Sequence, residues 1–338
     1  MTLTKGKEEP RDKLMDNYKI EIYTHSADMP DVQGEDFFHS AELFRMYEQT
    51  PRHKPLMVVT LGKGGVQGHM LAVVSYKWGL MPPYLYAHCR VIGEGDYCGT
   101  ERQREAMFGA MLNALTRKLR HRALYVEFSN LSRKMFGYKE FRRAGYFPVH
   151  WMSIHNSLHS RTPEERISPR MMRHIKHAAE RGVTTREVDG EDDLQVFARL
   201  MKAHNKWKPR RHTPDETFFR RLQADSHARL FITQHKGRTI GCCACVYWGG
   251  NAYVWHLASL RKSYVTLHPD IATVWAVIKH AHAHGYAHIN FMDVGLPFRR
   301  NRFREFILRF GGKPVSSYRW FMVNIGWVNR LLKWIYFG

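Results

Sequence analysis

The sequence predicts an α/β protein with mixed sheets, built from two tandem copies of one unit. The first observation is a repeated stretch, because residues 57–68 read MVVTLGKGGVQG and residues 230–241 read LFITQHKGRTIG. The two copies align without a gap, so that Thr60 matches Thr233. The second observation is that the same order of segments follows each copy. The third is length, since 338 residues are enough for two hydrophobic cores.

Each copy of the stretch predicts a β-hairpin. An apolar run precedes a shared Lys-Gly pair, and a second apolar run follows the last shared glycine, which is Gly68 or Gly241. Two apolar runs joined by a glycine-containing turn are typical of paired antiparallel strands. An amphipathic helix is expected before each hairpin, over 40–49 and 191–207.

Each hairpin is followed by a predicted strand, loop, helix and strand. In the first half these are a strand and glycine-rich loop within 84–99, a helix from Glu101 and a strand over 123–131. In the second half they are a strand over 251–260, a loop over 261–270, a helix over 271–285 and a strand over 286–295. Apolar residues at helical spacing predict the buried face of the first long helix: Met107, Phe108, Met111, Leu112, Leu115 and Leu119.

These elements set the domain boundaries that we expect. Residues 1–17 are polar and are expected to be disordered, 18–160 to form the first domain, 161–319 the second, and 320–338 a basic amphipathic helix. The N-terminus has no apolar run typical of a signal peptide, and no stretch is apolar enough to span a membrane. The five cysteines lack a disulfide or zinc spacing, which fits a cytoplasmic location.

The charge indicates an anionic partner. Fifty-two Lys and Arg residues against 31 Asp and Glu residues give a formal net charge of +21. Such an excess favours nucleic acid, a phospholipid surface or a phosphate-bearing small molecule. The basic residues are densest over 206–212 and 299–304, so we take as candidates for anion or acceptor binding Lys206, Arg210, Arg302 and Arg304.

The segment HPD at 268–270 opens the second long helix. Proline is tolerated in a first helical turn, and the N–H groups beyond it have no partner within the helix, so such a start can bind phosphate. The corresponding loop of the first half carries Glu94 and Asp96, which repel anions. The alternative is that HPD only caps the helix. For a phosphate-bearing donor, the candidate residues are Thr266, Leu267, His268 and Asp270.

Three further features are candidates for function. Asp293 ends a predicted strand before Gly295, where a carboxylate can orient or deprotonate an amine or, equally, cap the next turn. The run HAHAH at 280–284 has no third ligand at metal spacing, so no metal site is expected. The tail 320–338 combines an apolar stripe with basic and aromatic residues, which is typical of an interfacial helix, although it can also dock on the other domain.

The repeated order of elements resembles the GNAT acyltransferase fold, and its doubling resembles the Fem family of peptidoglycan bridge-forming aminoacyltransferases. The Asp-x-Gly step at 293–295, the Phe-Gly-Gly at 310–312 and FFHS at 37–40 are also similar to that family. Together the likeness covers roughly residues 35–320. In the segment 168–188, the residues that match the family's pattern are Arg173, Ile175, Lys176, Ala178, Gly182 and Val183.

The sequence departs from this family in two places. Members that transfer amino acids often carry Phe-Lys before Phe-Gly-Gly, whereas this chain has Phe306 and Ile307, which leaves Arg304 or Arg309 to replace the lysine. The long helical arm of some members is also missing. Both departures weaken the interpretation that the donor is an aminoacyl-tRNA.

The resemblance implies that an amine attacks an activated acyl carbon without a covalent enzyme intermediate. This reaction needs a neutral amine, a polarised carbonyl and a protonated leaving group. Asp293 or His256 is expected to serve the amine, backbone N–H groups of 254–260 the carbonyl, and Tyr264 the leaving group. The co-substrate is expected to be acyl-CoA, an acyl-carrier thioester or aminoacyl-tRNA, without a tightly bound cofactor.

Two functions remain open at this point. The leading one is an N-acyltransferase that acts on an amine of a cell-wall or envelope precursor. The alternative is a non-catalytic protein of the same doubled fold, which binds RNA or anionic membrane through its basic surface. Ile307 favours the second and the HPD segment the first. The expected partners are an anionic co-substrate, tRNA or an anionic membrane. The C-terminal helix is expected to hold the protein at the inner face of that membrane. The protein is expected to be a monomer.

Overall fold

The computed structural model describes residues 18–78, 85–129, 131, 135–206, 213–292 and 294–337. The chain forms two compact units. The first consists of the described residues up to Glu48, of Arg52–Val149 and of the segment from Arg319 onward. The second consists of Gln49–Pro51 and His150–Tyr318. The sequence predicts a boundary at 160, whereas the contacts divide the chain after Val149 and return the C-terminal segment to the first unit.

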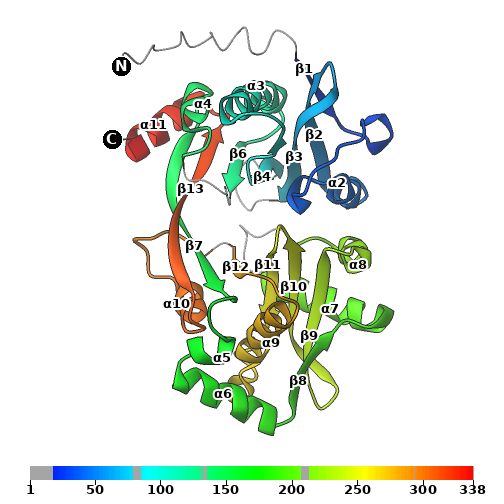
Figure 1. The fold of residues 1–338 in the computed structure, drawn as a ribbon, viewed down its shortest axis with the longest axis vertical. Helices are drawn as coiled ribbons and strands as arrows, with labels where there is room; N and C mark the ends of the chain where they lie inside the picture. The colour runs from blue at the N-terminus through cyan, green and yellow to red at the C-terminus, as the bar shows by residue number, and fades with distance from the viewer. Residues whose placement is uncertain are drawn as a thin grey trace, which may run out of the picture. The chain divides into compact units, whose positions relative to one another are not determined.

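The first unit is a twisted sheet with helices on it (Figure 1). Its strands lie in the order β1-β2-β3-β4-β6-β13-β7, with β5 paired to β3. The elements are β1 (Lys19–Tyr23), η1 (Ser26–Asp28), η2 (Phe37–His39), α2 (Ala41–Glu48), β2 (His53–Gly62), β3 (Gly65–Trp78), β4 (Leu85–Ile92), β5 (Asp96–Tyr97), α3 (Glu101–Leu119), β6 (Tyr125–Ser129), α4 (Tyr138–Arg143), the start of β7 (Phe147–Ser157), the end of β13 (Lys313–Val323) and α11 (Gly326–Phe337).

The second unit repeats this plan. Its strands lie in the order β8-β9-β10-β11-β12-β7-β13. The elements are the rest of β7, α5 (Pro163–Arg166), α6 (Pro169–Glu180), β8 (Val183–Glu187), α7 (Gly190–Asn205), α8 (Glu216–Ala224), β9 (Ala228–His235), β10 (Arg238–Trp248), β11 (Asn251–Ser259), η3 (Val265–Leu267), α9 (Pro269–Ala283), β12 (His288–Phe291), α10 (Arg302–Leu308) and the start of β13.

The repeated stretch forms the same hairpin at the same place in both sheets. It is β2-β3 in the first unit and β9-β10 in the second, second and third from the edge in each. Thr60 pairs with Gly68, as Thr233 pairs with Gly241. Each hairpin also has a β-bulge at the residue before that glycine. Because a bulge changes the twist and register of a strand, this shared irregularity confirms that the two halves repeat one fold.

The last two strands of each sheet are exchanged between the halves of the chain. In the first unit the end of β13 lies between β6 and β7, and Trp320 pairs with Phe128. In the second unit β7 lies between β12 and β13, and Ile289 pairs with Asn156. Each inner strand is therefore supplied by the segment that the sequence order assigns to the other half.

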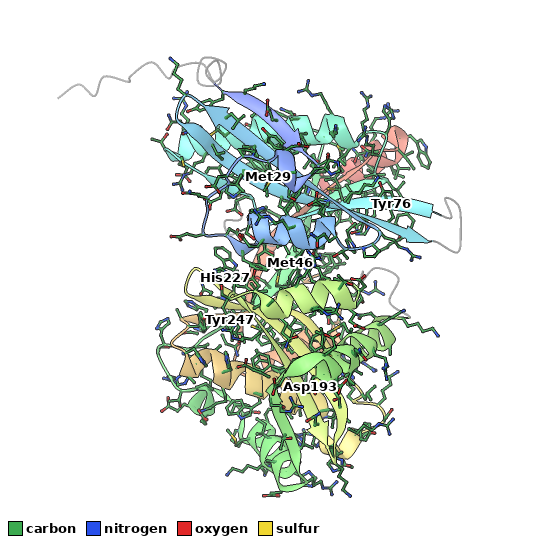
Figure 2. All side chains as sticks on the ribbon, turned by 90° about the vertical axis from the view of Figure 1, so that its right-hand side faces the viewer. Met29, Met46, Tyr76, Asp193, His227 and Tyr247 are labelled. Carbon is green, nitrogen blue, oxygen red and sulfur yellow. The ribbon has the colours of Figure 1, made fainter. Side chains whose placement is uncertain are left out.

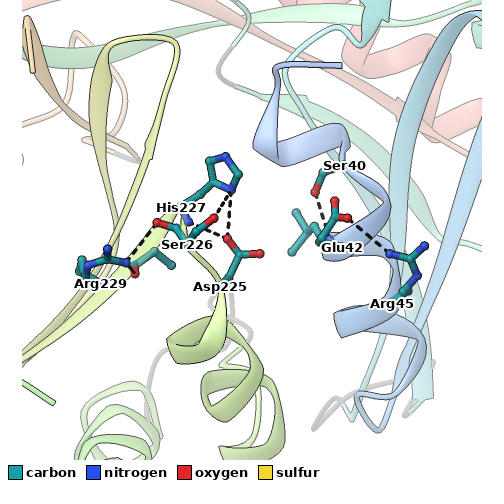
Figure 3. A network of polar contacts seen from close by, with 9 residues as sticks. Ser40, Glu42, Arg45, Asp225, Ser226, His227 and Arg229 are labelled. Atoms are coloured by element: carbon teal, nitrogen blue, oxygen red, sulfur yellow. Dashed lines mark hydrogen bonds and ion pairs between the residues drawn. The ribbon is translucent and has the colours of Figure 1, made fainter. Parts of the chain in front are cut away.

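The helices form where the sequence predicts them because each has an apolar face and an N-terminal cap. Thr100 and Gln103 make a capping box at the start of α3, and the six residues of its predicted face are all buried, which confirms that prediction. Ser40 accepts a hydrogen bond from the Leu43 N–H at the start of α2 (Figure 3). In α7, Asp193 accepts from Arg186 of β8 at 2.9 Å (Figure 2).

Local polar contacts fix the entry into the second hairpin. After α8, the carboxylate of Asp225 accepts from the His227 N–H at 2.8 Å and lies 3.2 Å from the His227 ring nitrogen (Figure 3). This contact closes the turn that leads into β9. Cys242, Cys243 and Cys245 are buried free thiols in the next strand, so they contribute to packing. None of the helices in the described parts of the chain has the length and apolarity that a bilayer crossing requires.

Candidate active site

The sheet of the second unit opens where β11 and β12 part. Their parallel pairing ends at Val254 and Phe291, while β11 stays paired with β10 as far as Ser259. The chain after β12 stays beside β7, and the Gly295 carbonyl accepts from the Met152 N–H at 3.0 Å. Along residues 255–259, therefore, β12 no longer pairs with β11, while β10 still does. We call the side of β11 that faces away from β10 along these residues the open edge.

A β-bulge lies where the open edge begins. Val254 and His256 pair with consecutive residues of β10, so that Trp255 between them is the extra residue. Bulges re-aim a strand and are common beside active sites. Here the bulge coincides with the point at which β11 leaves β12.

Two backbone N–H groups point toward the open edge. The Leu260 N–H donates to the Ile240 carbonyl, on the β10 side, at 2.8 Å. Successive N–H groups of a strand point to opposite sides, so those of Ser259 and Leu257 point away from β10. Such fixed donors can hold and polarise a carbonyl group.

The helix that follows the open edge, α9, begins among basic side chains. The ring of His268, its N-cap residue, lies 4.3 Å from the ring of His174 and 6.3 Å from that of His177, both in α6. Burial, together with these two histidines and Arg181, lowers the pKa of His268. His174, His177 and Arg181, which can carry positive charge, thus lie near a helix start, whose own dipole favours an anion, while the lowered pKa favours the neutral form of His268.

His268 also has an unusual backbone. Its φ is 46°, in the left-handed region, where non-glycine residues other than Asn, Asp and His are rare. Such conformations cluster at functional sites. The left-handed step turns the chain from η3 directly into α9.

The other three predicted donor residues behave differently. Leu267 is buried in a small cluster with Val183 and Ile240, so only its backbone is available to a donor. Thr266 is exposed. The Asp270 carboxylate accepts from the Ile271 N–H at 3.0 Å, and its role toward a donor stays a prediction.

Two of the three predicted catalytic residues, His256 and Tyr264, lie in the described part of the chain. The ring of His256 lies 5.5 Å from that of Phe219 in α8. Tyr264 packs instead against the cluster beneath α6, and the guanidinium of Arg238 lies 5.9 Å from its ring. Asp293 lies outside the described residues, so its role stays a prediction.

The described candidates for anion binding come from different elements. Lys206 follows α7 and Arg302 opens α10, and both are exposed. Arg304 has another role, because its guanidinium donates to the backbone carbonyls of Leu296 and Arg299, at 2.5 and 2.8 Å. Arg304 thus holds a loop in place, which occupies the donors an anion would use. Arg210 lies outside the described residues.

The Phe-Gly-Gly segment is explained by packing. A Cβ on Gly312 would lie 2.2 Å from the side-chain oxygen of Asn156 in β7, and the Asn156 amide donates to the Phe310 carbonyl at 2.9 Å. Ile307, at the place where the family resemblance suggests a lysine, is fully buried in the main core of the unit. A charged side chain at this position would be buried in apolar surroundings, so the core explains the isoleucine.

In the described residues of the first unit, the corresponding strands do not part before the end of β4. The pairing of β4 with β6 continues to Ile92 and Ser129, and the Gly93 N–H then donates to the Ser129 carbonyl at 2.7 Å. The loop that follows is acidic. Burial, with Glu94 and Asp96 adding to it, raises the pKa of Asp36 beside this loop to about 7.

The sequence family of the second unit agrees with this geometry. Residues 168–300 match the family model of the acetyltransferase (GNAT) domain. This match lies wholly within the second unit. A search of curated proteins found no match to the sequence.

Solved structures share the doubled GNAT fold over most of the chain. FemX has a TM-score of 0.60 at 13% identity, covering 88% of this chain and 94% of its own. A tandem GNAT protein from the clavulanic acid biosynthesis pathway has a TM-score of 0.53 at 12% identity, covering 90% of this chain and 99% of its own. L-PGS from Bacillus licheniformis has a TM-score of 0.54 at 14% identity, covering 78% of this chain and 86% of its own. The fold of the chain is therefore Fem-like, as the sequence predicts.

Histidines at the other end of α9 in the GNAT domain make protein contacts. His280 lies 3.0 Å from the Tyr247 hydroxyl through one ring nitrogen and 3.2 Å from a Glu187 oxygen through the other. The ring of His284 stacks on it, with centroids 4.0 Å apart. In the described residues no group of three or more potential metal-binding side chains is found.

Sequence reasoning missed three residues of the GNAT site. His174, His177 and Arg181 share one face of α6, at spacings of three and four, and this face meets the start of α9. The spacing was visible in the segment 168–188. What it could not reveal is that α6 packs against α9, because this contact joins residues about ninety positions apart.

Proposed function

We propose that the protein transfers an acyl group from a phosphate-bearing thioester, bound in the GNAT domain of the second unit, to an amine of a cell-wall or envelope precursor. The observation that carries this proposal is the pairing of an open edge on β11 with a basic start of α9. GNAT domains use acyl-CoA as a co-substrate. A coenzyme A thioester has both parts that such a site would bind, a carbonyl beside a flexible chain and a set of phosphates.

The envelope acceptor is supported by the fold. FemX shares it, and so does the C-terminal domain of a putative lysylphosphatidylglycerol synthetase from Agrobacterium fabrum, with a TM-score of 0.55 at 14% identity. An aminoacyl-tRNA is the second donor to test, because the same basic surface would attract it.

The reaction needs few protein groups. The N–H groups of Leu257 and Ser259 would hold the acyl carbonyl, while the amine nitrogen attacks its carbon and the C–N bond forms. The C–S bond then breaks, and the thiolate takes up a proton. The amine proton goes to a base, for which Asp293 and His256 stay the candidates, and Tyr264 stays the candidate for protonating the thiolate.

Thermal stability with and without acetyl-CoA tests the donor. A ligand at a hundred times its dissociation constant adds about 2.7 kcal/mol and raises the Tm. His268→Asp keeps a residue that tolerates the left-handed backbone but adds negative charge, so it is expected to weaken binding about tenfold. His268→Asn is the uncharged control. Asp293→Asn is expected to bind normally and to lose incorporation of labelled acyl group into cell-wall precursors.

A matched change in the first unit controls for general charge effects. Thr100→Asp keeps a capping residue at the start of α3 and adds the same charge, and it is expected to leave binding unchanged. A shift with bulk tRNA alone would instead assign an aminoacyl donor. No shift with either ligand would favour the non-catalytic alternative over transfer.

A further inference from the structure

One face of the C-terminal helix α11 is anchored in the first unit. The side-chain amide of Asn329 donates to the Gly145 carbonyl at 3.0 Å, and its oxygen accepts from the Val323 N–H at 2.9 Å. The ring of Tyr336 stacks on Phe147, with centroids 5.6 Å apart. The helix is therefore held in a fixed orientation on the domain to which it returns.

The opposite face of α11 presents large apolar side chains to solvent. Trp327, Leu331 and Trp334 are 67%, 48% and 74% exposed, and Ile335 beside them is 54% exposed. Their spacing of four, three and one residues places them along one ridge. Single exposed apolar residues are common in folded proteins, but a contiguous ridge with two tryptophans indicates a binding surface.

The elements that border this ridge are basic. Asn324, just before α11, donates to the carbonyls of Leu119 and Ala123 at the end of α3, and Figure 1 shows α11 beside α4. Segments 117–122, 138–143 and 324–337 together contain nine Lys or Arg residues. Their one acidic residue, Glu140, is buried and pairs with Arg143 at 3.3 Å.

The nine basic residues are distributed around the ridge rather than within it. Two of them, Arg330 and Lys333, belong to α11 itself, on the side away from Leu331 and Ile335. The others are the exposed side chains that end α3 and line α4: Arg117, Lys118, Arg120, Arg122, Lys139, Arg142 and Arg143. The surface thus combines an apolar ridge with a cationic border.

We propose that this surface, α11 with its basic border, docks the protein on an anionic phospholipid membrane. Tryptophan favours the level of the lipid headgroups, Leu331 and Ile335 would enter the acyl boundary, and the basic border would meet the lipid phosphates. RNA would use the cations but would leave the aliphatic side chains without a partner. The docking does not depend on the proposed acyl transfer, because it involves a surface of the first unit.

Vesicle sedimentation of the full-length protein, without any donor, tests the proposal. The protein is expected to sediment with vesicles of equal parts phosphatidylcholine and phosphatidylglycerol, but not with phosphatidylcholine alone. The double variant W327S/W334S is expected to bind the anionic vesicles at least tenfold more weakly. Because both side chains are exposed, its Tm should equal that of the wild type. R330Q/K333Q is expected to weaken binding about fivefold per charge removed.

Matched controls use other exposed apolar residues. Phe298 and Val315 are 75% and 38% exposed and lie in the second unit, outside the surface, so F298S/V315S is expected to bind as the wild type does. Equal vesicle binding by W327S/W334S and wild type would overturn the proposal. So would a wild-type dimer in light scattering that W327S/W334S converts to a monomer, because a second copy would then cover the ridge. Loss of tRNA binding in that variant, with vesicle binding unchanged, would assign the surface to RNA.

Discussion

Gly241 and its counterpart Gly68 let the loop or helix that follows lie directly on the sheet. A Cβ on Gly241 would lie 2.5 Å from the Thr273 hydroxyl of α9, and one on Gly68 would lie 2.6 Å from the Tyr97 ring. Thr273 also contacts Thr233, with the two hydroxyl oxygens 2.6 Å apart. Of the residues that the two hairpins share, Thr233 and Gly241 therefore set how closely α9 approaches the sheet.

We expect Gly241→Ala to destabilise the second unit by about 1–3 kcal/mol, because α9 must shift away from β10. Gly64→Ala, in the turn of the first hairpin, has its nearest neighbour at 3.6 Å and is the control, expected to change stability by less than about 0.5 kcal/mol. Urea unfolding of both variants measures the difference. Equal midpoints would show that α9 is not held by this close approach.

The exchanged strands β7 and β13 are the elements on which each unit depends most. Trp320 in β13 is fully buried in the first unit and stacks on Phe141, with centroids 4.7 Å apart. A chain that ends at residue 160 lacks this strand and leaves β6 without one of its neighbours. Burial of a tryptophan and the pairing of a central strand are both lost in such a fragment.

A fragment of residues 18–160 is therefore expected to lack a cooperative thermal transition in circular dichroism. As the control, residues 18–149 joined by a flexible linker to 319–338 contain β1 to β6 and the parts of β7 and β13 that belong to the first unit, and they are expected to unfold cooperatively. A cooperative transition of the shorter fragment would mean that β13 is dispensable and that 160 is a true domain boundary.

Local elements were predictable from the sequence, whereas their distant partners were not. The helix expected over 271–285 is observed at Pro269–Ala283, and the strand expected over 251–260 at Asn251–Ser259, because periodicity and capping act within a few residues. The exchange of β7 and β13 pairs residues about 190 positions apart, for example Phe128 with Trp320. Nothing in a local pattern encodes that pairing.

The candidate site shows the same division. His268 and the start of α9 could be located from HPD, but the open edge depends on where β12 stops pairing with β11. The contribution of His174 and Arg181 depends on the packing of α6 against α9. Tyr264 and His256 were chosen for their place in the chain, and their side chains contact other elements.

At the scale of the whole molecule, the two units share one fold but differ in two respects. One is the charge near the start of the long helix, and the other is whether the two parallel strands stay paired to their ends. The first unit pairs β4 with β6 to the end of β4 and carries Glu94 and Asp96 in the loop before α3. The second parts β11 from β12 and surrounds the start of α9 with histidines and Arg181. This asymmetry is the basis for assigning the donor to the second unit.

Amide hydrogen exchange of the full-length protein, with and without saturating acetyl-CoA, tests the assignment of the donor most directly. Bound thioester would occupy the N–H groups of the open edge and of the start of α9. We predict slower exchange in peptides that cover 255–273 and unchanged exchange in the corresponding peptides of the first unit, 88–106. Protection of 88–106, or unchanged exchange in both regions, would contradict the account.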